Sequence, residues 1–386
     1  MGEKYGCVLL AGGRGRRMGG VDKSALIYEG ETFGARIGQQ LEMLGYPCYR
    51  SEAFRDSFPE NGGKGKWTVL RDIVTDREGG FIGPMGGIWS CFQQTGAQRL
   101  FFVSCDMPLF RREMALLLLE AAGEEEDWDA LLWRTRDGRI HPVCGWYSIS
   151  CLSVLEKALQ KGNYRMMDFL SGLNCRIMDT SCAHIPDSWF ANVNRPEVYA
   201  KLKEKSCAVL AVSGRKNTGK TWLLEKIVEE LSGRGIRTAV IKHDGHDFEP
   251  DTPGTDSYRM KKAGAYGTAV YSAFRFSLVK DTPGMTAEDL ISCFPEADLI
   301  LLEGQKNSSY PKIEVLRREI SGEPVCDPST VLAYVKNWKS EEEVTKQPSR
   351  SGTAALQLSF EDVDAILELV ISRIDQAQTK HRISAT

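Results

Sequence analysis

The fold of the second half of the chain is decided by the stretch AVLAVSGRKNTGKT at residues 208–221. Its first five residues are apolar, as in a buried strand, and they run into a glycine-rich turn with the spacing Gly-x-x-x-x-Gly-Lys-Thr. Residues 222–231 then predict a helix directly after the turn. A strand, a glycine-rich turn and a helix in this order predict the first β–α junction of a parallel α/β domain.

This turn is a complete Walker A motif in the context that the motif requires. Backbone N–H groups of such a loop surround phosphates, and we expect Lys220 to reach the β- and γ-phosphates while Thr221 binds Mg²⁺. A second apolar strand, residues 299–302, ends at Glu303, which is placed to bind Mg²⁺ directly or through water. The predicted nucleotide-binding residues of the loop are Gly214, Asn217, Thr218, Gly219, Lys220 and Thr221.

The first half of the chain has the same plan near its start. Apolar residues 7–10 run into Ala11-Gly12-Gly13, and four cationic side chains follow within the next ten positions: Arg14, Arg16, Arg17 and Lys23. Glycine lets backbone N–H groups approach a phosphate closely, and the N-terminus of a following helix favours anions. This density of positive charge predicts a polyphosphate ligand, although a solvated basic loop explains a bare glycine-rich turn about as well.

Polar residues also follow a second strand of this half. Residues 100–104 are apolar up to Ser104 and lead into Cys105-Asp106-Met107-Pro108. A carboxylate at the end of a strand suits a Mg²⁺ ligand beside phosphates, whereas an isolated aspartate there is more often a cap or turn residue. Further along, Asp137-Gly138-Arg139 predicts a hairpin turn that leads His141 into the next strand, where a structural role for this histidine is the simpler interpretation.

The length of 386 residues predicts two domains, since one domain commonly takes roughly 100–200 residues. The charged stretch at residues 201–205 lies just before the second strand–turn–helix unit, and we place the domains at residues 1–204 and 205–386. Apolar residues at helical spacing between 360 and 374 predict a helix that closes the second domain.

Composition excludes several classes of protein. The chain is 42% hydrophobic and 26% charged with a net charge of -3, so neither wholesale disorder nor a nucleic-acid coat protein is expected. It has no apolar run near the ~18 residues that cross a bilayer and no signal-peptide pattern, so a cytoplasmic protein without membrane partners is expected. Eleven scattered cysteines without a Cys-x-x-Cys pair predict reduced, mostly buried thiols.

Residues 10–23, with the pattern Leu-Ala-Gly-Gly…Arg-Met-Gly-Gly-Val-Asp-Lys, resemble the signature of the molybdenum cofactor guanylyltransferase family (MobA). Four further segments follow in the order of that family: Gly83-Pro84…Gly87, Cys105–Pro108, Gly138–Val143 and Phe190–Pro196. The resemblance implies a Rossmann-like nucleotidyltransferase fold. The Leu-Ala-Gly-Gly form goes with GTP in this family and a Leu-Ala-Ala-Gly form with cytidylyl relatives, so Gly13 favours guanine.

The same resemblance implies roles for individual residues. GTP would be held by Leu10, Ala11, Gly12, Gly13, Lys23, Asp72 and Asp106, with Asp76 competing for the place of Asp72. Asp106 would bind Mg²⁺ and act with Lys23 and Arg17 in catalysis, and the molybdopterin side would be lined by Arg17, Gly20, Gly83, Gly87, Asn192 and Asn194. Gly15 stands where relatives usually carry Ser or Ala. A family asparagine after the second strand has no placed counterpart, although Ser51 and Glu52 lie near there.

The second half resembles the molybdopterin-guanine dinucleotide biosynthesis adapter family (MobB). Beyond the Walker A loop, the matching segments are residues 241–246, 251–259, 263–265 and 302–304. The resemblance implies a P-loop NTPase-type parallel sheet that binds GTP, hydrolyses it slowly, tends to form homodimers and assists the transferase. No Asn-Lys-x-Asp guanine motif occurs in the sequence, and His243 and His246 have no predicted role.

These features together predict a bifunctional protein that transfers GMP from GTP to molybdopterin, or Mo-molybdopterin, with release of pyrophosphate. Molybdenum-insertion proteins and molybdoenzymes are expected as partners. Two alternatives stay open: a cytidylyl- or sugar-nucleotide transferase, and a non-catalytic GTP-binding protein that only holds the cofactor.

Overall fold

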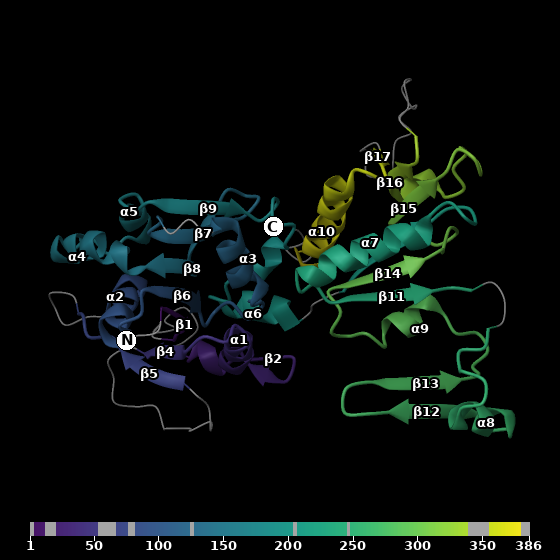
Figure 1. Ribbon diagram of the computed structural model, residues 1–386, viewed down its shortest axis with the longest axis horizontal. Helices are drawn as coiled ribbons and strands as arrows, with labels where there is room; N and C mark the ends of the chain where they lie inside the picture. The colour runs from purple at the N-terminus through teal and green to yellow at the C-terminus, as the bar shows by residue number, and fades with distance from the viewer. Residues whose placement is uncertain are drawn as a thin grey trace. The chain divides into compact units, whose positions relative to one another are not determined.

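The computed structural model describes residues 4–11, 21–52, 67–75, 82–123, 127–203, 207–244, 248–338 and 355–379. Contacts group the chain into two compact units, each with its own sheet (Figure 1). The first unit comprises Met1–Ser206 together with Leu367–Thr386, and the second comprises Cys207–Ile366. The assignment of residues 1–204 and 205–386 to two functional domains stays a prediction.

The first unit is built on a seven-stranded sheet in the order β5-β4-β1-β6-β8-β7-β9. Strands β5, β4, β1 and β6 are parallel, whereas β8 runs antiparallel to both β6 and β7. The reversal brings the amino end of β8 to the same sheet edge as the carboxyl ends of the parallel strands. The strand bounds are β1 Tyr5–Leu10, β4 Cys48–Glu52, β5 Trp67–Arg71, β6 Arg99–Ser104, β7 Ala130–Arg134, β8 Ile140–Ser148 and β9 Cys175–Asp179.

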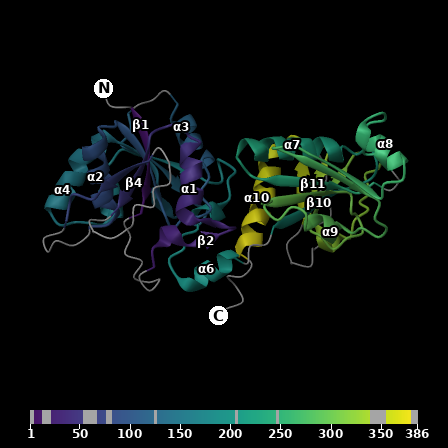
Figure 2. The same cartoon turned by 90° about the horizontal axis from the view of Figure 1, so that it is seen from below.

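Helices cover both faces of this sheet. Figure 2 shows α2 and α4 on one side and α1 and α3 on the other. Because β1 and β6 are central, their apolar side chains are buried on both faces, which explains the nearly continuous hydrophobic runs at residues 7–10 and 100–103. The helix bounds are α1 Phe33–Glu42, α2 Pro84–Thr95, α3 Glu113–Ala122, α4 Leu152–Gln160, α5 Met166–Leu170 and α6 Pro196–Lys203.

The second unit has a wholly parallel six-stranded sheet in the order β11-β14-β10-β15-β16-β17. Helices α7 and α9 lie on its opposite faces (Figure 2), and a separate antiparallel hairpin is formed by β12 and β13. The bounds are β10 Ala208–Ser213, α7 Lys220–Gly233, β11 Thr238–Lys242, α8 Asp256–Lys262, β12 Gly267–Tyr271, β13 Phe276–Lys280, α9 Ala287–Ile291, β14 Leu299–Glu303, β15 Lys312–Leu316, β16 Val331–Lys336, β17 Leu356–Ser359 and α10 Val363–Thr379.

The α/β class is confirmed, and so is the predicted strand–turn–helix plan of the second unit. Strand β10 leads through the Walker A turn into α7, whereas most of the predicted turn after β1 lies outside the described residues, and the next described helix is the short 3₁₀ helix Lys23–Ala25. The predicted closing helix exists as α10, but contacts group its residues from Leu367 onward with the first unit. All eleven cysteines are free and seven are buried, which agrees with the expectation that the thiols are mostly buried.

The first glycine of the Walker A turn carries a local constraint that can be tested. Gly214 has a φ of +140°, and an added Cβ would lie 2.4 Å from the carbonyl oxygen of Val315. We therefore expect Gly214→Ala to lower the unfolding free energy by at least about 2 kcal/mol, measured by thermal and urea unfolding. Gly233→Ala is the matched control, because nothing lies within 4 Å of the added Cβ. Equal stability of the two variants would contradict this account.

Candidate functional site

A cavity of about 320 Å³ opens at the carboxyl edge of the four parallel strands in the first unit. Leu10 ends β1, Ser51 lies near the end of β4, Asp72 follows β5 and Asp106 follows β6, and all four line the cavity. The antiparallel β8 adds residues 140–143 from its amino end. Convergence of strand ends at one edge is how open α/β sheets form ligand sites.

Lys23 and Asp106 form the charged centre of the cavity. Lys23 Nζ lies 3.1 Å from Asp106 Oδ2 and also donates a hydrogen bond to Asn194 Oδ1. Asp22 orients the lysine by capping the short 3₁₀ helix Lys23–Ala25, where its side chain accepts from the Ser24 N–H at 2.8 Å. The backbone carbonyl of Asp106 accepts from the Val193 N–H at 2.8 Å, which holds residues 192–194 beside the centre.

The second carboxylate oxygen of Asp106 lacks a hydrogen-bond partner. Asp106 is 8% exposed, and within the part of the chain that the structure describes its Oδ1 is buried and unpartnered. A buried carboxylate oxygen is costly unless a donor or a cation satisfies it. This atom is therefore suited to a metal ion or to a ligand hydroxyl.

Asp72 and Ser51 form a second polar pair in the cavity. Ser51 Oγ donates to Asp72 Oδ1 at 3.1 Å, and Gly87 packs closely over both. A Cβ at Gly87 would lie 3.2 Å from Leu10 Cδ2 and 3.4 Å from Ser51 Oγ, so a side chain there would intrude on the cavity. Burial raises the pKa of Asp72 to about 6, and the hydrogen bond from Ser51 opposes this rise.

His141 contributes a neutral imidazole to the wall. Burial, with the positive charge of Arg139 nearby, lowers the pKa of His141 to about 4. Its Nε2 lies 3.1 Å from Thr135 Oγ1, and its ring is 4.6 Å from that of Phe190. At neutral pH this histidine can exchange hydrogen bonds with a ligand but adds no positive charge.

The structure brings most of the described predicted residues together. The cavity is lined by Leu10, Lys23, Asp72, Gly83, Gly87, Asp106, Asn192 and Asn194. Ala11 is not among the lining residues, and its N–H donates to the Ser51 carbonyl at 2.9 Å. Gly12, Gly13, Arg17 and Gly20 lie outside the described residues, as does the competing Asp76.

The sequence missed the lining residues Ser51, Arg139 and His141. Ser51 had a weak signal, because it lies one residue before the end of β4, near the place where the resemblance implies an asparagine. Arg139 and His141 lie in a segment that matched the family pattern, but Arg139 had no assigned role and the sequence favoured a structural role for His141, which lines the cavity. For all three, only the strand order shows that they reach the cavity.

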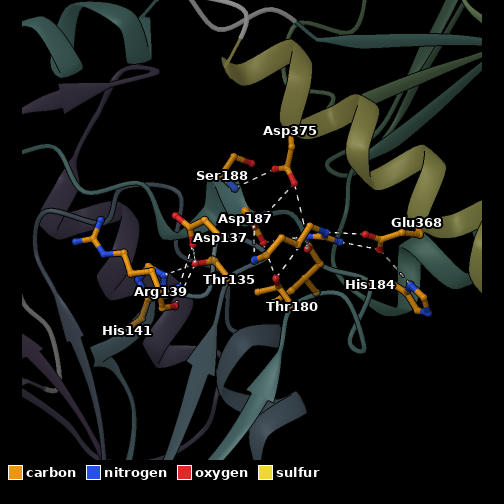
Figure 3. Close-up of polar contacts among 12 residues, drawn as sticks. Thr135, Asp137, Arg139, His141, Thr180, His184, Asp187, Ser188, Glu368 and Asp375 are labelled. Atoms are coloured by element: carbon orange, nitrogen blue, oxygen red, sulfur yellow. Dashed lines mark hydrogen bonds and ion pairs between the residues drawn. The ribbon is translucent and has the colours of Figure 1, made fainter. Parts of the chain in front are cut away.

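A second, larger cavity of about 760 Å³ adjoins the first, since Arg139, His141, Asn192 and Asn194 line both. Part of its wall is an ionic network of the first unit (Figure 3). Arg136 donates to both carboxylate oxygens of Glu368 and to Asp187, and Asp375 accepts from the N–H groups of Asp187 and Ser188. The network joins the segment that begins at Leu367 to the rest of the first unit.

The Walker A loop of the second unit has the geometry of a phosphate site. Thr221 Oγ1 donates to Glu303 Oε1 at 2.9 Å, so the two predicted metal ligands lie side by side at the ends of α7 and β14. Lys220 Nζ donates to the Arg215 carbonyl at 2.6 Å, and burial lowers the pKa of its ammonium group. Asn217 and Gly219 have φ values of +63° and +103°. These left-handed residues curl the loop around the space in front of α7.

The structure also bears on metal clusters, on membrane-spanning helices and on the two histidines without a predicted role. Within the described ranges no three His, Cys, Asp or Glu side chains are grouped as a metal site, and no helix is long and apolar enough to cross a membrane. His243 is exposed after β11, whereas His246 lies outside the described residues.

Two family models match the chain in separate parts. The MobA-like NTP transferase domain matches residues 7–175, and the model for molybdopterin guanine dinucleotide synthesis protein B matches residues 209–337. Each match covers most of one sheet and contains one of the two predicted phosphate-binding turns.

Curated relatives divide in the same way. A molybdopterin-guanine dinucleotide biosynthesis adapter protein of Haemophilus influenzae is 38% identical over 34% of this chain and 76% of its own length. The adapter protein of Escherichia coli is 42% identical over 28% of this chain, which spans 65% of that protein. A molybdenum cofactor guanylyltransferase of Mannheimia succiniciproducens is 32% identical over 42% of this chain and 81% of its own length.

Proposed function

Because the chain belongs to the molybdenum cofactor guanylyltransferases in its first part and to the molybdopterin-guanine dinucleotide biosynthesis adapter proteins in its second, we propose that it makes molybdopterin guanine dinucleotide. The first unit would transfer GMP from GTP to molybdopterin or Mo-molybdopterin and release pyrophosphate. The observation that carries this proposal is the Lys23–Asp106 pair, with one buried unpartnered carboxylate oxygen, in a cavity at the sheet edge.

The reaction demands little acid–base chemistry from the protein. The terminal phosphate of the acceptor is already a nucleophile, and it attacks the α-phosphorus of GTP while the bond to pyrophosphate breaks. Lys23 would neutralise charge that develops on the phosphates, and Asn194 and Asp106 hold its ammonium group in place. Gly87 leaves room for the substrates, and the neutral His141 would form hydrogen bonds on the side shared with the second cavity.

The donor set of the cavity fits a Mg²⁺ ion that is held mainly by substrate. Mg²⁺ is commonly bound through one or two carboxylates together with phosphates and water. Asp106 offers one unpartnered oxygen, which would serve as the protein ligand. When bound, the ion would supply charge neutralisation on the phosphates.

The direct test is incubation of the full-length protein with GTP, Mg²⁺ and molybdopterin, followed by detection of the dinucleotide and of pyrophosphate. Formation of both is the expected result. Preferential turnover of CTP would favour the cytidylyl alternative, and binding of GTP and molybdopterin without pyrophosphate release would favour the non-catalytic alternative.

The elevated pKa of Asp72 predicts how GTP binding to the first unit depends on pH. If the ionised carboxylate accepts hydrogen bonds from the nucleotide, protonation below a pKa of about 6 removes that acceptor. The apparent Kd for GTP should therefore rise roughly tenfold between pH 7.5 and pH 5. Equilibrium dialysis on the Lys220→Ala background measures this site without the Walker A loop. Asp72→Asn should show weaker binding with a flat profile; a slope as steep as that of the parent would contradict the assignment.

For the second unit we propose binding and slow hydrolysis of GTP at the Walker A loop. The support is the Thr221–Glu303 hydrogen bond and the left-handed curl of residues 217 and 219. Mg²⁺ would be held by these two side chains together with the β- and γ-phosphates. Assistance to the transferase is the role that the adapter relatives suggest.

We also propose that the second unit forms a homodimer through the β12–β13 hairpin. Its aromatic side chains are unusually exposed: Tyr271 is 85%, Phe274 95% and Phe276 79% accessible. Contiguous exposed apolar side chains mark interaction surfaces. Sedimentation analysis should show a dimer that Phe274→Glu combined with Phe276→Glu converts to a monomer, whereas Lys226→Glu on α7 should leave it intact. Unchanged sedimentation of the double variant would exclude the hairpin.

A further inference from the structure

The second unit contains a cavity of about 470 Å³ that begins at the Walker A loop, where Thr218 and Gly219 form part of its wall. From there it extends over the carboxyl ends of β16 and β17, which supply Lys336 and Ser359. The sheet order places these two strands on the side of β10 that is opposite β14, away from Glu303. A nucleotide with its phosphates in the loop could thus extend its base into this cavity.

Aromatic rings form much of the cavity wall. Trp222 from the first turn of α7 and Phe360 after β17 meet edge to face with their centroids 5.4 Å apart, and Trp338 lies after β16. Phe360 packs against the Walker A loop, because a Cβ on Gly219 would lie only 3.1 Å from Phe360 Cζ. Trp222 is 44% exposed. Flat aromatic walls next to a phosphate loop suit a nucleobase, because every base presents a π-face for stacking.

Two cations line this cavity: Arg317, which forms an ion pair with Glu319 at 3.4 Å, and Lys336, the last residue of β16. Lys336 is only 6% exposed, and its Nζ lies 5.7 Å from the centre of the Trp338 ring. Across the described ranges its side chain makes no hydrogen bond or ion pair. The Lys336 side chain is largely buried and its ammonium group has no acceptor among the described residues, so this group is free to donate to an acceptor on a ligand.

The residue after Lys336, Asn337, fixes the end of β16 against the segment that follows β15. Asn337 Oδ1 accepts from the Arg318 N–H at 3.0 Å, and its Nδ2 donates to Glu319 Oε2 at 2.7 Å. Both hydrogen bonds tie the end of β16 to the segment after β15. Asn337 therefore acts as a positioning residue whose own polar atoms are already occupied.

We infer that this cavity is the base subsite of the Walker A nucleotide, and that Lys336 selects guanine by donating to its O6 and N7 acceptors. Adenine presents an amino donor at the position of O6, so the lysine disfavours it. The aromatic wall binds either purine, and of the two cations in the lining Arg317 is already paired with Glu319, so we assign discrimination to Lys336. The subsite thus recognises guanine without an Asn-Lys-x-Asp motif, and the inference rests on the proposed GTP binding by the loop.

The test uses the full chain carrying Lys23→Ala, so that the Walker A site dominates GTP binding in equilibrium dialysis. The same chain with Lys220→Ala added defines the signal that does not come from the loop. Competing ligands are ATP and the triphosphate of 2-aminopurine riboside, which lacks the 6-oxo group. GTP should bind at least about tenfold more tightly than either competitor.

Adding Lys336→Met should weaken GTP binding by about tenfold to a hundredfold, and should weaken both competitors, which keep N7 but lack O6, by far less. Lys226→Met, which changes an exposed lysine of α7, should have no effect. Unchanged GTP affinity in Lys336→Met, or an equal loss for all three nucleotides, would overturn the inference. Failure of Lys220→Ala to weaken GTP binding would instead overturn the proposed function of the loop.

A second measurement leaves Lys336 intact and so does not depend on the folding of a variant. After irradiation with 8-azido-GTP, the base-linked label should map to peptides that contain Trp222, Trp338 or Phe360. Labelling that depends on Lys220 but maps to other peptides of the second unit would place the base elsewhere.

Discussion

Asp106→Asn should abolish guanylyl transfer while leaving the fold intact. The substitution keeps the size of the side chain and the backbone hydrogen bond from Val193, but it removes the charge that faces Lys23 and the oxygen offered to a metal ion. Loss of a charged metal ligand is expected to lower the rate by ~10²–10³. Pyrophosphate release at saturating GTP and molybdopterin measures the effect, and urea unfolding checks stability.

The control for this variant is Asp127→Asn, which removes the same charge at an exposed position outside the cavity. It should retain the parental rate. Near-parental turnover of Asp106→Asn at saturating Mg²⁺ would show that the unpartnered oxygen has no part in transfer, and the site would then have to be reassigned.

Exchanging the two lysines for alanine should separate the two nucleotide sites. Lys23 lies in the cavity where the α-phosphate would react, whereas Lys220 begins α7 beside the β- and γ-phosphate positions. Lys220→Ala should abolish release of inorganic phosphate from GTP and leave transfer to purified molybdopterin largely intact. Lys23→Ala should have the reverse effect. Removing a cation from a polyphosphate site commonly costs a few kcal/mol, or roughly a hundredfold in rate.

Both activities are measured on the same preparations, so that misfolding would be evident as a loss of both. Lys226→Ala on the exposed face of α7 is the common control. Should Lys220→Ala stop transfer as completely as Lys23→Ala, the two phosphate-binding turns would not be separable sites. The division of labour between the two parts of the chain would then be wrong.

Local features of the fold were predictable where one short segment contains all of the physical information. The Walker A turn is such a segment, because its glycines adopt positive φ angles that other residues rarely take, and a buried strand and an amphipathic helix flank it directly. The Lys220 and Thr221 positions follow from the spacing alone. The same reasoning located Asp106, since it stands directly after an apolar strand.

The direction of strand β8 and the surface against which helix α10 packs were harder to predict from the sequence. Strand β8 has the apolar pattern of any buried strand, and its direction follows only from its pairing with β6 and β7. Helix α10 has a clear amphipathic pattern, yet the pattern does not say which surface covers it. Its contacts through Glu368 and Asp375 with the Arg136 network therefore emerged only from the structure.

By itself, the sequence determined that this protein has two α/β parts, and it predicted a phosphate-binding turn after the first strand of each and the lysines and carboxylates that follow. Only the tertiary structure decided which of these groups meet. Lys23 is 83 residues from Asp106 and 171 from Asn194, and Lys336 reaches the same cavity as Phe360 only through the pairing of β16 with β17. The hydrophobic pattern of a strand indicates that the strand is buried, but it does not indicate which strand lies beside it in the sheet. The order of the strands, chosen by packing of the whole sheet, therefore created both cavities.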